Sequence, residues 1–258
     1  MNKQFENIPH GKKVFFASDF HLGAPNAQSS RQRELKIIRW LDSIKAEAAG
    51  VFIVGDIFDF WFEYKHVIPK GAIRFQAKLL ELMDDGIPVL FFTGNHDMWM
   101  FDYFTSELGI PVYREPETFL IDGKKVLVGH GDGLGPGDHF YKFLKFFFNS
   151  SLCKWAFSWV HPNIGMGIAN YWSGKSRIAN DSKEDVYLGE QEWLLQYCRE
   201  VEQDTPHDLY VFGHRHLPID VEVSDNGSRY INLGEWVTQC RYLELSSSVQ
   251  KLIQFEGK

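Results

Sequence analysis

Five apolar runs of the chain each end in a cluster of Asp, His or Asn side chains, and this feature constrains the fold most. The runs are KVFFASDFH (13–21), GVFIVGDIFD (50–59), IPVLFFTGNHD (87–97), KVLVGHGD (125–132) and HDLYVFGHRH (207–216). Continuous apolar runs of this length, bounded by glycine, are typical of strands buried on both faces. The sequence therefore predicts buried strands with polar groups at their carboxyl ends.

The segments between the first three runs have helical patterns. Residues 29–48 begin with serines that can cap a helix, and residues 71–86 end with a glycine at the expected C′ position. Alternation of strand and helix predicts parallel pairing, with the sheet covered on both sides. The final third predicts more strands at 218–225, 229–234 and 239–247, with a hairpin turn at 225–228. We therefore predict an α/β (α+β) fold, a two-sheet sandwich within a single domain spanning residues 1–258.

Residues 136–186 have a different composition, dense in Phe and Trp with interleaved Lys and Arg. They separate the fourth and fifth runs by more than a crossover needs, so we predict an aromatic-rich helical cap inserted into the domain. Two interpretations of the cap stay open. It is either an ordinary helical subdomain with its own core, or a surface that contacts acyl chains or a membrane, since each methylene removed from water contributes about 0.8 kcal/mol.

The charge and the cysteines exclude other classes of protein. A net charge of −7 argues against nucleic-acid binding, which needs a basic surface. Three widely spaced cysteines without a CxxC motif indicate a reducing compartment. We find neither an apolar signal segment at the N-terminus nor an apolar stretch of membrane-spanning length, so we expect a cytoplasmic protein. The sequence predicts no particular protein partner.

The polar clusters predict a metal site, because ligands of open α/β sheets lie outside the carboxyl ends of the strands. Carboxylate, amide and imidazole groups without thiolate suit Mn, Fe, Zn, Mg or Co, with manganese expected first. The candidate ligands are Asp19, His21, Asp56, Asn95, His130, His214 and His216. Their number exceeds the needs of one tetrahedral ion and predicts two divalent ions sharing a carboxylate. Alternation along an extended strand end would direct both imidazoles of GHRH into the site.

Taken together, the motifs resemble those of the calcineurin-like metallophosphoesterases. The matching segments are DFH (19–21), GDIFD (55–59), GNHD (94–97), GHGD (129–132) and GHRH (213–216). The resemblance implies a four-layer β-sandwich flanked by helices. It also implies one metal held by Asp19, His21, Asp56 and His216, and a second held by Asp56, Asn95, His130 and His214, with Asp56 bridging both.

The resemblance also implies roles in phosphoester hydrolysis for residues beside the metals. His96 would donate a hydrogen bond or proton to the phosphoryl or leaving oxygen, and Asp59 would orient His96. Asp97 is expected to be a structural partner at its turn, and an exchange of roles between Asp97 and Asp59 is the alternative. Arg215, between two ligand histidines, is expected to point away from the metals and to be solvated or in an ion pair.

The region after the fourth motif is similar to one branch of this family, the pyrophosphatases of lipid A biosynthesis. Ser176, Asn180 and Lys183 would share one helix face, and Asp138 lies eight residues after His130. The resemblance implies that these four contact substrate together with Asn95, His96 and His214. It implies a lipid-linked nucleotide substrate, UDP-2,3-diacylglucosamine, and peripheral contact with the inner face of the cytoplasmic membrane.

One residue departs from that branch and leaves alternatives open. The best-known members carry Arg at the position of His96, and the GNHD motif is that of general phosphoesterases. The alternatives are a phosphoesterase acting on phosphoprotein, nucleotide or cyclic nucleotide, and a non-catalytic binding scaffold. A scaffold would be expected to have lost metal ligands, and all seven ligand positions are filled here.

Overall fold

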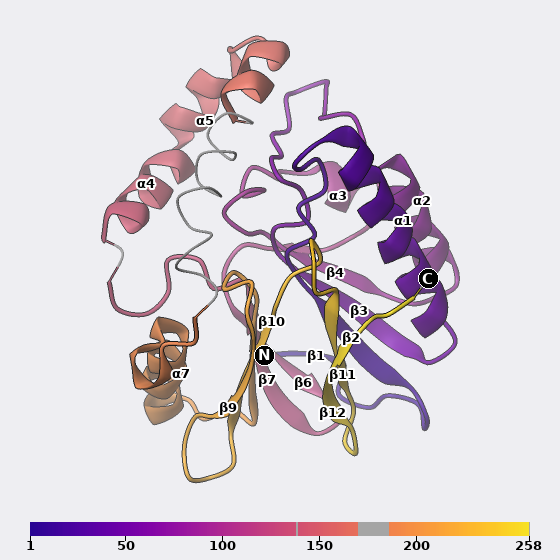
Figure 1. Ribbon diagram of the computed structural model, residues 1–258, viewed down its shortest axis with the longest axis vertical. Coiled ribbons are helices and arrows are strands. Elements are labelled where there is room, and N and C mark those ends of the chain that lie inside the picture. The colour runs from indigo at the N-terminus through magenta and orange to yellow at the C-terminus, as the bar shows by residue number, and fades with distance from the viewer. Residues whose placement is uncertain (138, 170–185, 258) are drawn as a thin grey trace.

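Two six-stranded sheets packed face to face form the centre of the protein, as the computed structural model shows (Figure 1). The structure describes residues 1–137, 139–169 and 186–257. Helices cover the outer faces of the sheets, which gives four layers. The predicted two-sheet α/β sandwich is therefore confirmed.

The first sheet carries the first three apolar runs at its centre. Its order is β12 (Gln250–Gln254), β11 (Arg241–Leu245), β2 (Lys13–Ala17), β3 (Ala48–Val54), β4 (Val89–Phe92) and β5 (Val112–Tyr113). Strands β2, β3, β4 and β5 are parallel, and Phe52 is in register with both Phe16 and Leu90. The parallel pairing expected from strand–helix alternation is confirmed.

The second sheet contains the remaining two runs. Its order is β1 (Asn2–Phe5), β6 (Glu117–Ile121), β7 (Lys124–Gly129), β8 (Leu209–Phe212), β10 (Arg229–Leu233) and β9 (Pro218–Glu222). Strands β7 and β8 pair in parallel, so their carboxyl ends lie at one edge. Strands β9 and β10 form the antiparallel hairpin predicted from the turn at 225–228.

Aromatic side chains fill the space between the two sheets. Phe16 and Phe52 stack with ring centroids 4.7 Å apart, and Phe119 of the opposite sheet meets Phe52 edge-on at 4.9 Å. On the outer side of the first sheet lie α1 (Ala27–Ile44) and α2 (Ile73–Asp84), whose Trp40 and Phe75 are fully buried. Helix α7 (Trp193–Asp204) covers the second sheet. Both faces of each sheet are thus removed from water, which explains the unbroken apolar runs.

The ends of α1 and α2 test the capping predictions. The expected serine cap at residue 29 is wrong, because Asn26 is the N-cap and its side chain accepts a hydrogen bond from the Ser29 amide at 2.9 Å. Asn is as good a cap as Ser, so the helix starts earlier than its serines suggest. At the end of α2, Gly86 adopts φ +77° and donates to the Met83 carbonyl, as expected for a glycine at C′.

Helices α4 (His139–Asn149) and α5 (Ser151–Ser158) extend away from the sandwich, and residues 162–169 are also helical (Figure 1). One side of α5 contacts the body, where the Phe157 ring lies 4.7 Å from Phe62 and 4.8 Å from Trp99. The other side faces solvent, where Trp155 is 61% exposed and Trp159, the residue that follows the helix, is 76% exposed. No residue of α5 is buried.

Two short elements complete the described chain, α3 (Tyr103–Ser106) and the 3₁₀ turn η1 (Gly189–Gln191). Among the described helices, none combines the length and apolar character needed to cross a bilayer.

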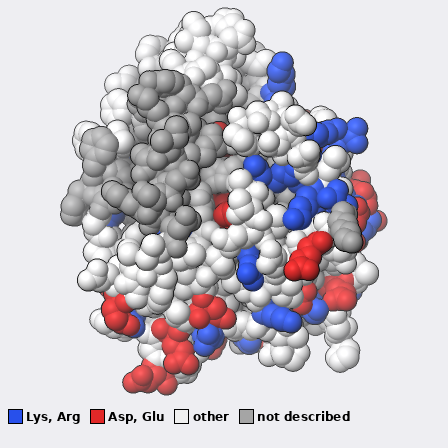
Figure 2. All heavy atoms as spheres, viewed as in Figure 1, with Lys and Arg blue, Asp and Glu red and all other residues white. Residues whose placement is uncertain are grey.

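Figure 2 shows acidic side chains gathered where β9 and β10 form their hairpin. Helices α4 and α5 instead carry three lysines and no acidic residue.

Candidate metal centre

The predicted ligands lie just beyond the carboxyl ends of five central strands. Asp19 and His21 follow β2, Asp56 follows β3, and Asn95 follows β4. From the facing sheet, His130 follows β7, and both His214 and His216 follow β8. The sandwich thus brings residues that are up to 197 positions apart in the sequence, from 19 to 216, to one edge.

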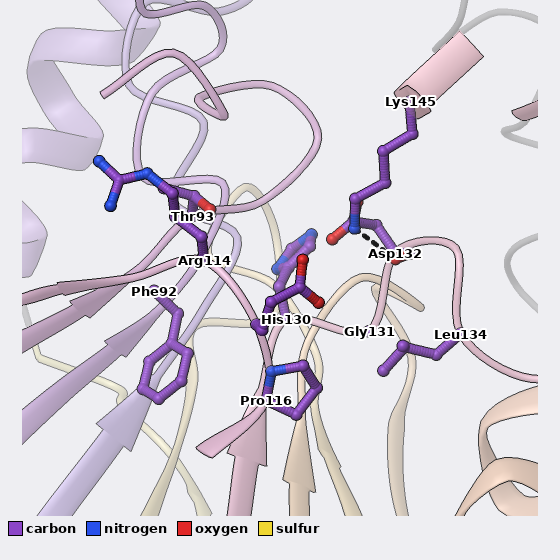
Figure 3. Close-up of a pocket in the computed structure, with 10 residues that line it drawn as sticks. Phe92, Thr93, Arg114, Pro116, His130, Gly131, Asp132, Leu134 and Lys145 are labelled. Carbon is purple, nitrogen blue, oxygen red and sulfur yellow. Dashed lines mark hydrogen bonds and ion pairs between the residues drawn. The ribbon is translucent and has the colours of Figure 1, made fainter. Parts of the chain in front are cut away.

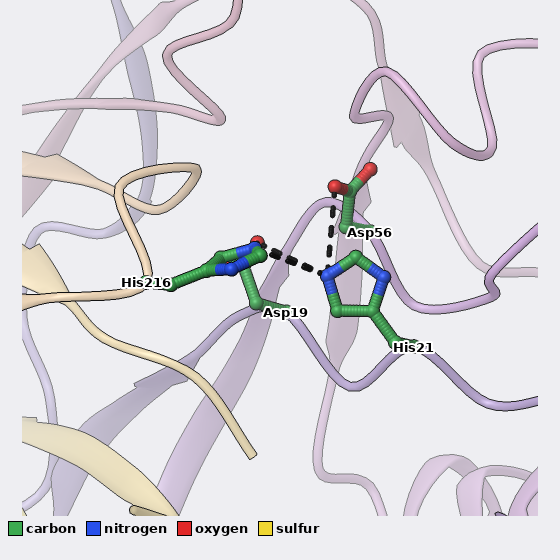
Figure 4. A group of neighbouring side chains, drawn as sticks. All are labelled: Asp19, His21, Asp56 and His216. Carbon is green, nitrogen blue, oxygen red and sulfur yellow. Dashed lines mark hydrogen bonds and ion pairs between the residues drawn. The ribbon is translucent and has the colours of Figure 1, made fainter. Parts of the chain in front are cut away.

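Four of these side chains form one compact group (Figure 4). The Nε2 atoms of His21 and His216 lie 3.2 Å apart, and His216 Nε2 lies 3.1 Å from Asp19 Oδ1. His21 Nε2 is 3.8 Å from Asp56 Oδ2. Two imidazole nitrogens and two carboxylates that converge in this way form a ligand set suited to one divalent ion.

The other predicted ligands form a second group around the same Asp56. His130 Nε2 lies 3.5 Å from Asp56 Oδ2, and the His130 and His214 rings are 5.2 Å apart. His214 Nδ1 lies 3.0 Å from Asn95 Oδ1. Asp56 is therefore the carboxylate common to both groups, which is the arrangement expected of a bridging ligand.

Unpaired buried atoms test whether these residues fit metal ions. Oδ1 of Asp19 and Nε2 of His130 are buried and make no hydrogen bond. A buried polar atom without a partner is costly, and ligand atoms are the ones that a bound cation would satisfy. The residues present thus fit a pair of divalent cations.

Turns position the ligands, and the expected extended alternation at the strand ends is wrong. Asp19, His21, Asp56, His214 and His216 all have positive φ, between +44° and +69°. This left-handed conformation is strained for residues other than glycine and is concentrated at functional sites. The paired imidazoles of GHRH reach the site because the chain turns at each ligand. They do not reach it by the two-residue repeat of a strand.

Two motif glycines are required by close packing against ligands. A Cβ atom on Gly94 would lie 2.2 Å from Asp56 Oδ1, and one on Gly213 would lie 2.6 Å from Asp19 Oδ2. Any larger residue would displace a carboxylate of the site. The glycines of GNHD and GHRH are thus part of the ligand geometry.

Opposite charges determine the ionisation of the central groups. Burial raises the pKa of Asp56, but the neighbouring His130 and His96 lower it well below its usual range. Burial lowers the pKa of His130, and the Asp56 carboxylate more than reverses this and raises it to about 10. Burial and the adjacent His130 lower the pKa of His214 to about 4. The carboxylates are therefore ionised at neutral pH and available to bind cations.

His96 lies beside the cluster at the surface of the site. Its backbone amide donates to Asp56 Oδ1 at 2.9 Å, and its ring meets His21 edge-on at 4.9 Å. His96 Nδ1 lies 2.9 Å from the Asp59 carbonyl oxygen and 4.0 Å from the Asp59 carboxylate. Contact between the two residues is thus made mainly through the backbone of Asp59.

Asp97 is the turn partner that the sequence suggested. Its carboxylate accepts hydrogen bonds from the amides of Gly94 and Ile57, both at 2.7 Å. Burial and the Asp56 carboxylate raise the pKa of Asp97 to about 7. These bonds tie the loop after β4 to the loop after β3, so the ligands Asn95 and Asp56 are held together.

Two supporting residues, Lys145 and Glu192, were not identified from the sequence. Lys145 of α4 pairs with Asp132 at 2.8 Å beside a small pocket that His130 also lines (Figure 3). Glu192 pairs with Arg215, which points away from the ligands as expected. Each pair joins two different elements or loops, which a pattern along the chain does not reveal. The predicted contact residues Asp138, Ser176, Asn180 and Lys183 lie outside the described residues.

This metal-binding sandwich defines a class of protein, and comparison with known families agrees. The family model described as calcineurin-like phosphoesterase matches residues 12–218, and the chain belongs to this family. It is a metal-dependent hydrolase with a dinuclear divalent-metal site.

Several named relatives extend over nearly the whole chain. A UDP-2,3-diacylglucosamine hydrolase from Porphyromonas gingivalis is 35% identical over 89% of this chain and 92% of its own length. Relatives with the same name from Shewanella pealeana and Vibrio atlanticus are 25% and 28% identical, covering 94% and 88% of this chain and 98% and 91% of their own lengths.

Proposed function

We propose that this protein hydrolyses the pyrophosphate bond of UDP-2,3-diacylglucosamine, releasing UMP and 2,3-diacylglucosamine 1-phosphate. The observation that carries the proposal is the match to a hydrolase named for this substrate over about nine-tenths of both chains.

The proposed first metal ligands are Asp19, His21, Asp56 and His216, and the proposed second set is Asp56, Asn95, His130 and His214. Bound divalent ions would supply an activated water and neutralise charge on the phosphoryl oxygens. We propose manganese as the metal, since the ligand set without thiolate accepts it.

The side chains around the ions would orient the pyrophosphate. His96 is half-buried at the rim, and its Nδ1–H donates to the Asp59 carbonyl, so its Nε2 would donate to a phosphoryl or leaving oxygen from the imidazolium form of the ring. Asn95 and His214 line the same side of the site, in contact with each other. Asp138, Ser176, Asn180 and Lys183 are proposed to contact the rest of the substrate.

The cap, residues 136–186, is proposed to receive the acyl chains and to contact the inner face of the cytoplasmic membrane. Helices α4 and α5 expose Phe143, Phe146, Phe147, Leu152, Trp155 and Trp159. Several large exposed apolar side chains close together in the sequence suit interaction with an apolar partner. Of the three lysines of these helices, Lys145 pairs with Asp132 and Lys142 donates to the Gly135 carbonyl, so Lys154 is the one proposed to meet an anionic headgroup.

The proposal is tested by incubating the purified protein and Mn²⁺ with UDP-2,3-diacylglucosamine and measuring UMP. Phosphopeptides, a cyclic nucleotide and bis(p-nitrophenyl) phosphate serve as comparison substrates. Release of UMP at a kcat/KM well above that for the comparison substrates is expected. Activity restricted to phosphopeptides or cyclic nucleotides would refute the lipid substrate but would still support metal-dependent phosphoester hydrolysis. His96 in the GNHD motif would then be the residue to examine.

A further inference from the structure

Arg215 lies between two proposed metal ligands but contacts a different layer of the molecule. Its side chain is 1% exposed, and that of its partner Glu192 is fully buried. The guanidinium donates to both carboxylate oxygens of Glu192, at 2.7 Å and 3.2 Å. Glu192 is the residue directly before α7, so this ion pair joins the ligand loop to the helix that covers the second sheet.

Two further contacts fix the orientation of the guanidinium. Its central carbon lies 4.4 Å from the Trp193 ring, in a cation–π arrangement. One terminal nitrogen also donates to the Val186 carbonyl at 3.0 Å. A planar guanidinium with a bidentate partner, an aromatic face and a carbonyl acceptor is held in one position, which a lysine cannot reproduce.

The backbone that Arg215 anchors is one of the strained parts of the site. His214 and His216 both have positive φ, and between them the Arg215 amide donates to the Gly213 carbonyl at 2.8 Å. Residues in this conformation persist only where the surroundings over-determine them. The Arg215 side chain points away from the proposed metal ligands. Anchoring it therefore holds the imidazoles of His214 and His216 toward the proposed metal positions.

We propose that Arg215, paired with Glu192, is a positioning residue that determines metal affinity by holding the 213–216 turn in its left-handed form. The inference rests on the proposed metal ligands and is independent of the identity of the substrate. Both proposed metal sites depend on this turn, since His216 belongs to one ligand set and His214 to the other.

The test measures Mn²⁺ binding directly, by electron paramagnetic resonance of free Mn²⁺ in titrations of the whole protein. Wild type, Arg215→Gln, Arg215→Lys and Glu192→Gln are compared. We expect Kd to rise at least tenfold in R215Q and E192Q, and less in R215K, which keeps the charge but not the planar fork. The matched control is Arg229→Gln, which removes an ion pair with Asp220 on the exposed face of the β9–β10 hairpin and should leave Kd within twofold.

A variant that removes both charges separates positioning from simple stabilisation. Replacing a buried ion pair by two apolar residues often restores stability, so Arg215→Met with Glu192→Leu should melt near wild type. A positioning role predicts that this double variant still binds Mn²⁺ weakly. A Kd within twofold of wild type in folded R215Q and in the double variant would overturn the inference. If wild type itself bound no Mn²⁺, the proposed ligand set would be wrong instead.

Discussion

At the residue scale, Asp56 is the side chain on which both proposed metal positions depend. We predict that Asp56→Asn lowers kcat about 1000-fold, roughly 4 kcal/mol of barrier, because an amide lacks the charge to bridge two cations. The assay is hydrolysis of bis(p-nitrophenyl) phosphate with saturating Mn²⁺, together with metal content after gel filtration. Asp225→Asn, an exposed carboxylate in the β9–β10 hairpin, is the control and should retain activity within twofold. Activity of D56N within tenfold of wild type would contradict the bridging role.

Glu202 on α7 gives a second residue-scale prediction, for pH dependence. Its carboxylate accepts hydrogen bonds from the His207 amide at 3.0 Å, from Asn226 at 2.6 Å and from the Tyr210 hydroxyl. Burial raises its pKa, but these bonds lower it below the ordinary 4.5. A lowered folded-state pKa contributes stability above the unfolded value, and this stability is lost as pH falls through the folded pKa.

Glu202→Gln should therefore reduce the free energy of unfolding by about 1–2 kcal/mol at pH 7. The difference from wild type should shrink as the pH falls below 4.5, since the wild-type carboxylate then becomes protonated. Urea denaturation of the wild type and the variant, at pH 7 and at a pH below 4.5, measures this difference in stability. Glu222→Gln, on an exposed pair with Arg229, should change stability little at either pH. A constant E202Q difference across the range would show that the charge of Glu202 contributes nothing.

At the element scale, the exposed side of α4 and α5 has no core of its own in the described structure, which favours an apolar partner over a self-contained subdomain. We predict that Trp155→Asp with Phe147→Asp reduces binding to anionic phospholipid vesicles at least tenfold, as measured by co-sedimentation. Hydrolysis of soluble bis(p-nitrophenyl) phosphate should stay within twofold, because neither residue contacts the metal cluster. Ile73→Asp, an equally exposed apolar residue on α2, should bind vesicles like wild type. Unchanged vesicle binding by the double variant would mean that this apolar surface does not bind membranes and has a different partner.

The elements also show how far the sequence predicts the fold. The central strands β2, β3, β4, β7 and β8 were identified because burial on both faces leaves an unbroken apolar run. The strands β1, β5 and β12 at the sheet edges, and β6 beside β1, are not predicted, because half-exposed strands carry mixed, short patterns. Strand ends predict the candidate ligand residues, and the family resemblance implies how they divide between two metals. The left-handed turns at these ligands are not predicted, since only Gly94 and Gly213, packed against carboxylates, hint at the backbone geometry.

At the scale of the whole molecule, the two sheets meet where acidic and imidazole groups are buried together. Asp19 and Asp56 are 0% and 1% exposed, and atoms of this cluster have no hydrogen-bond partner. Cations that bind only the folded chain stabilise it by about 2.7 kcal/mol for each site at one hundred times Kd. For a protein of this size, 1 kcal/mol corresponds to about 2–4 °C in Tm.

We therefore predict that removing metal with EDTA lowers Tm by about 5–10 °C for each site that was loaded to that extent, and that adding Mn²⁺ in excess of the chelator restores it. Differential scanning calorimetry before and after metal depletion is the measurement. Asp56→Asn is the internal control, because loss of the shared ligand should make Tm nearly insensitive to EDTA. Because the ligands come from both sheets, the metals should also make the sandwich unfold as one unit. A Tm that does not respond to EDTA in a protein shown to contain metal would mean that the ions do not join the two sheets.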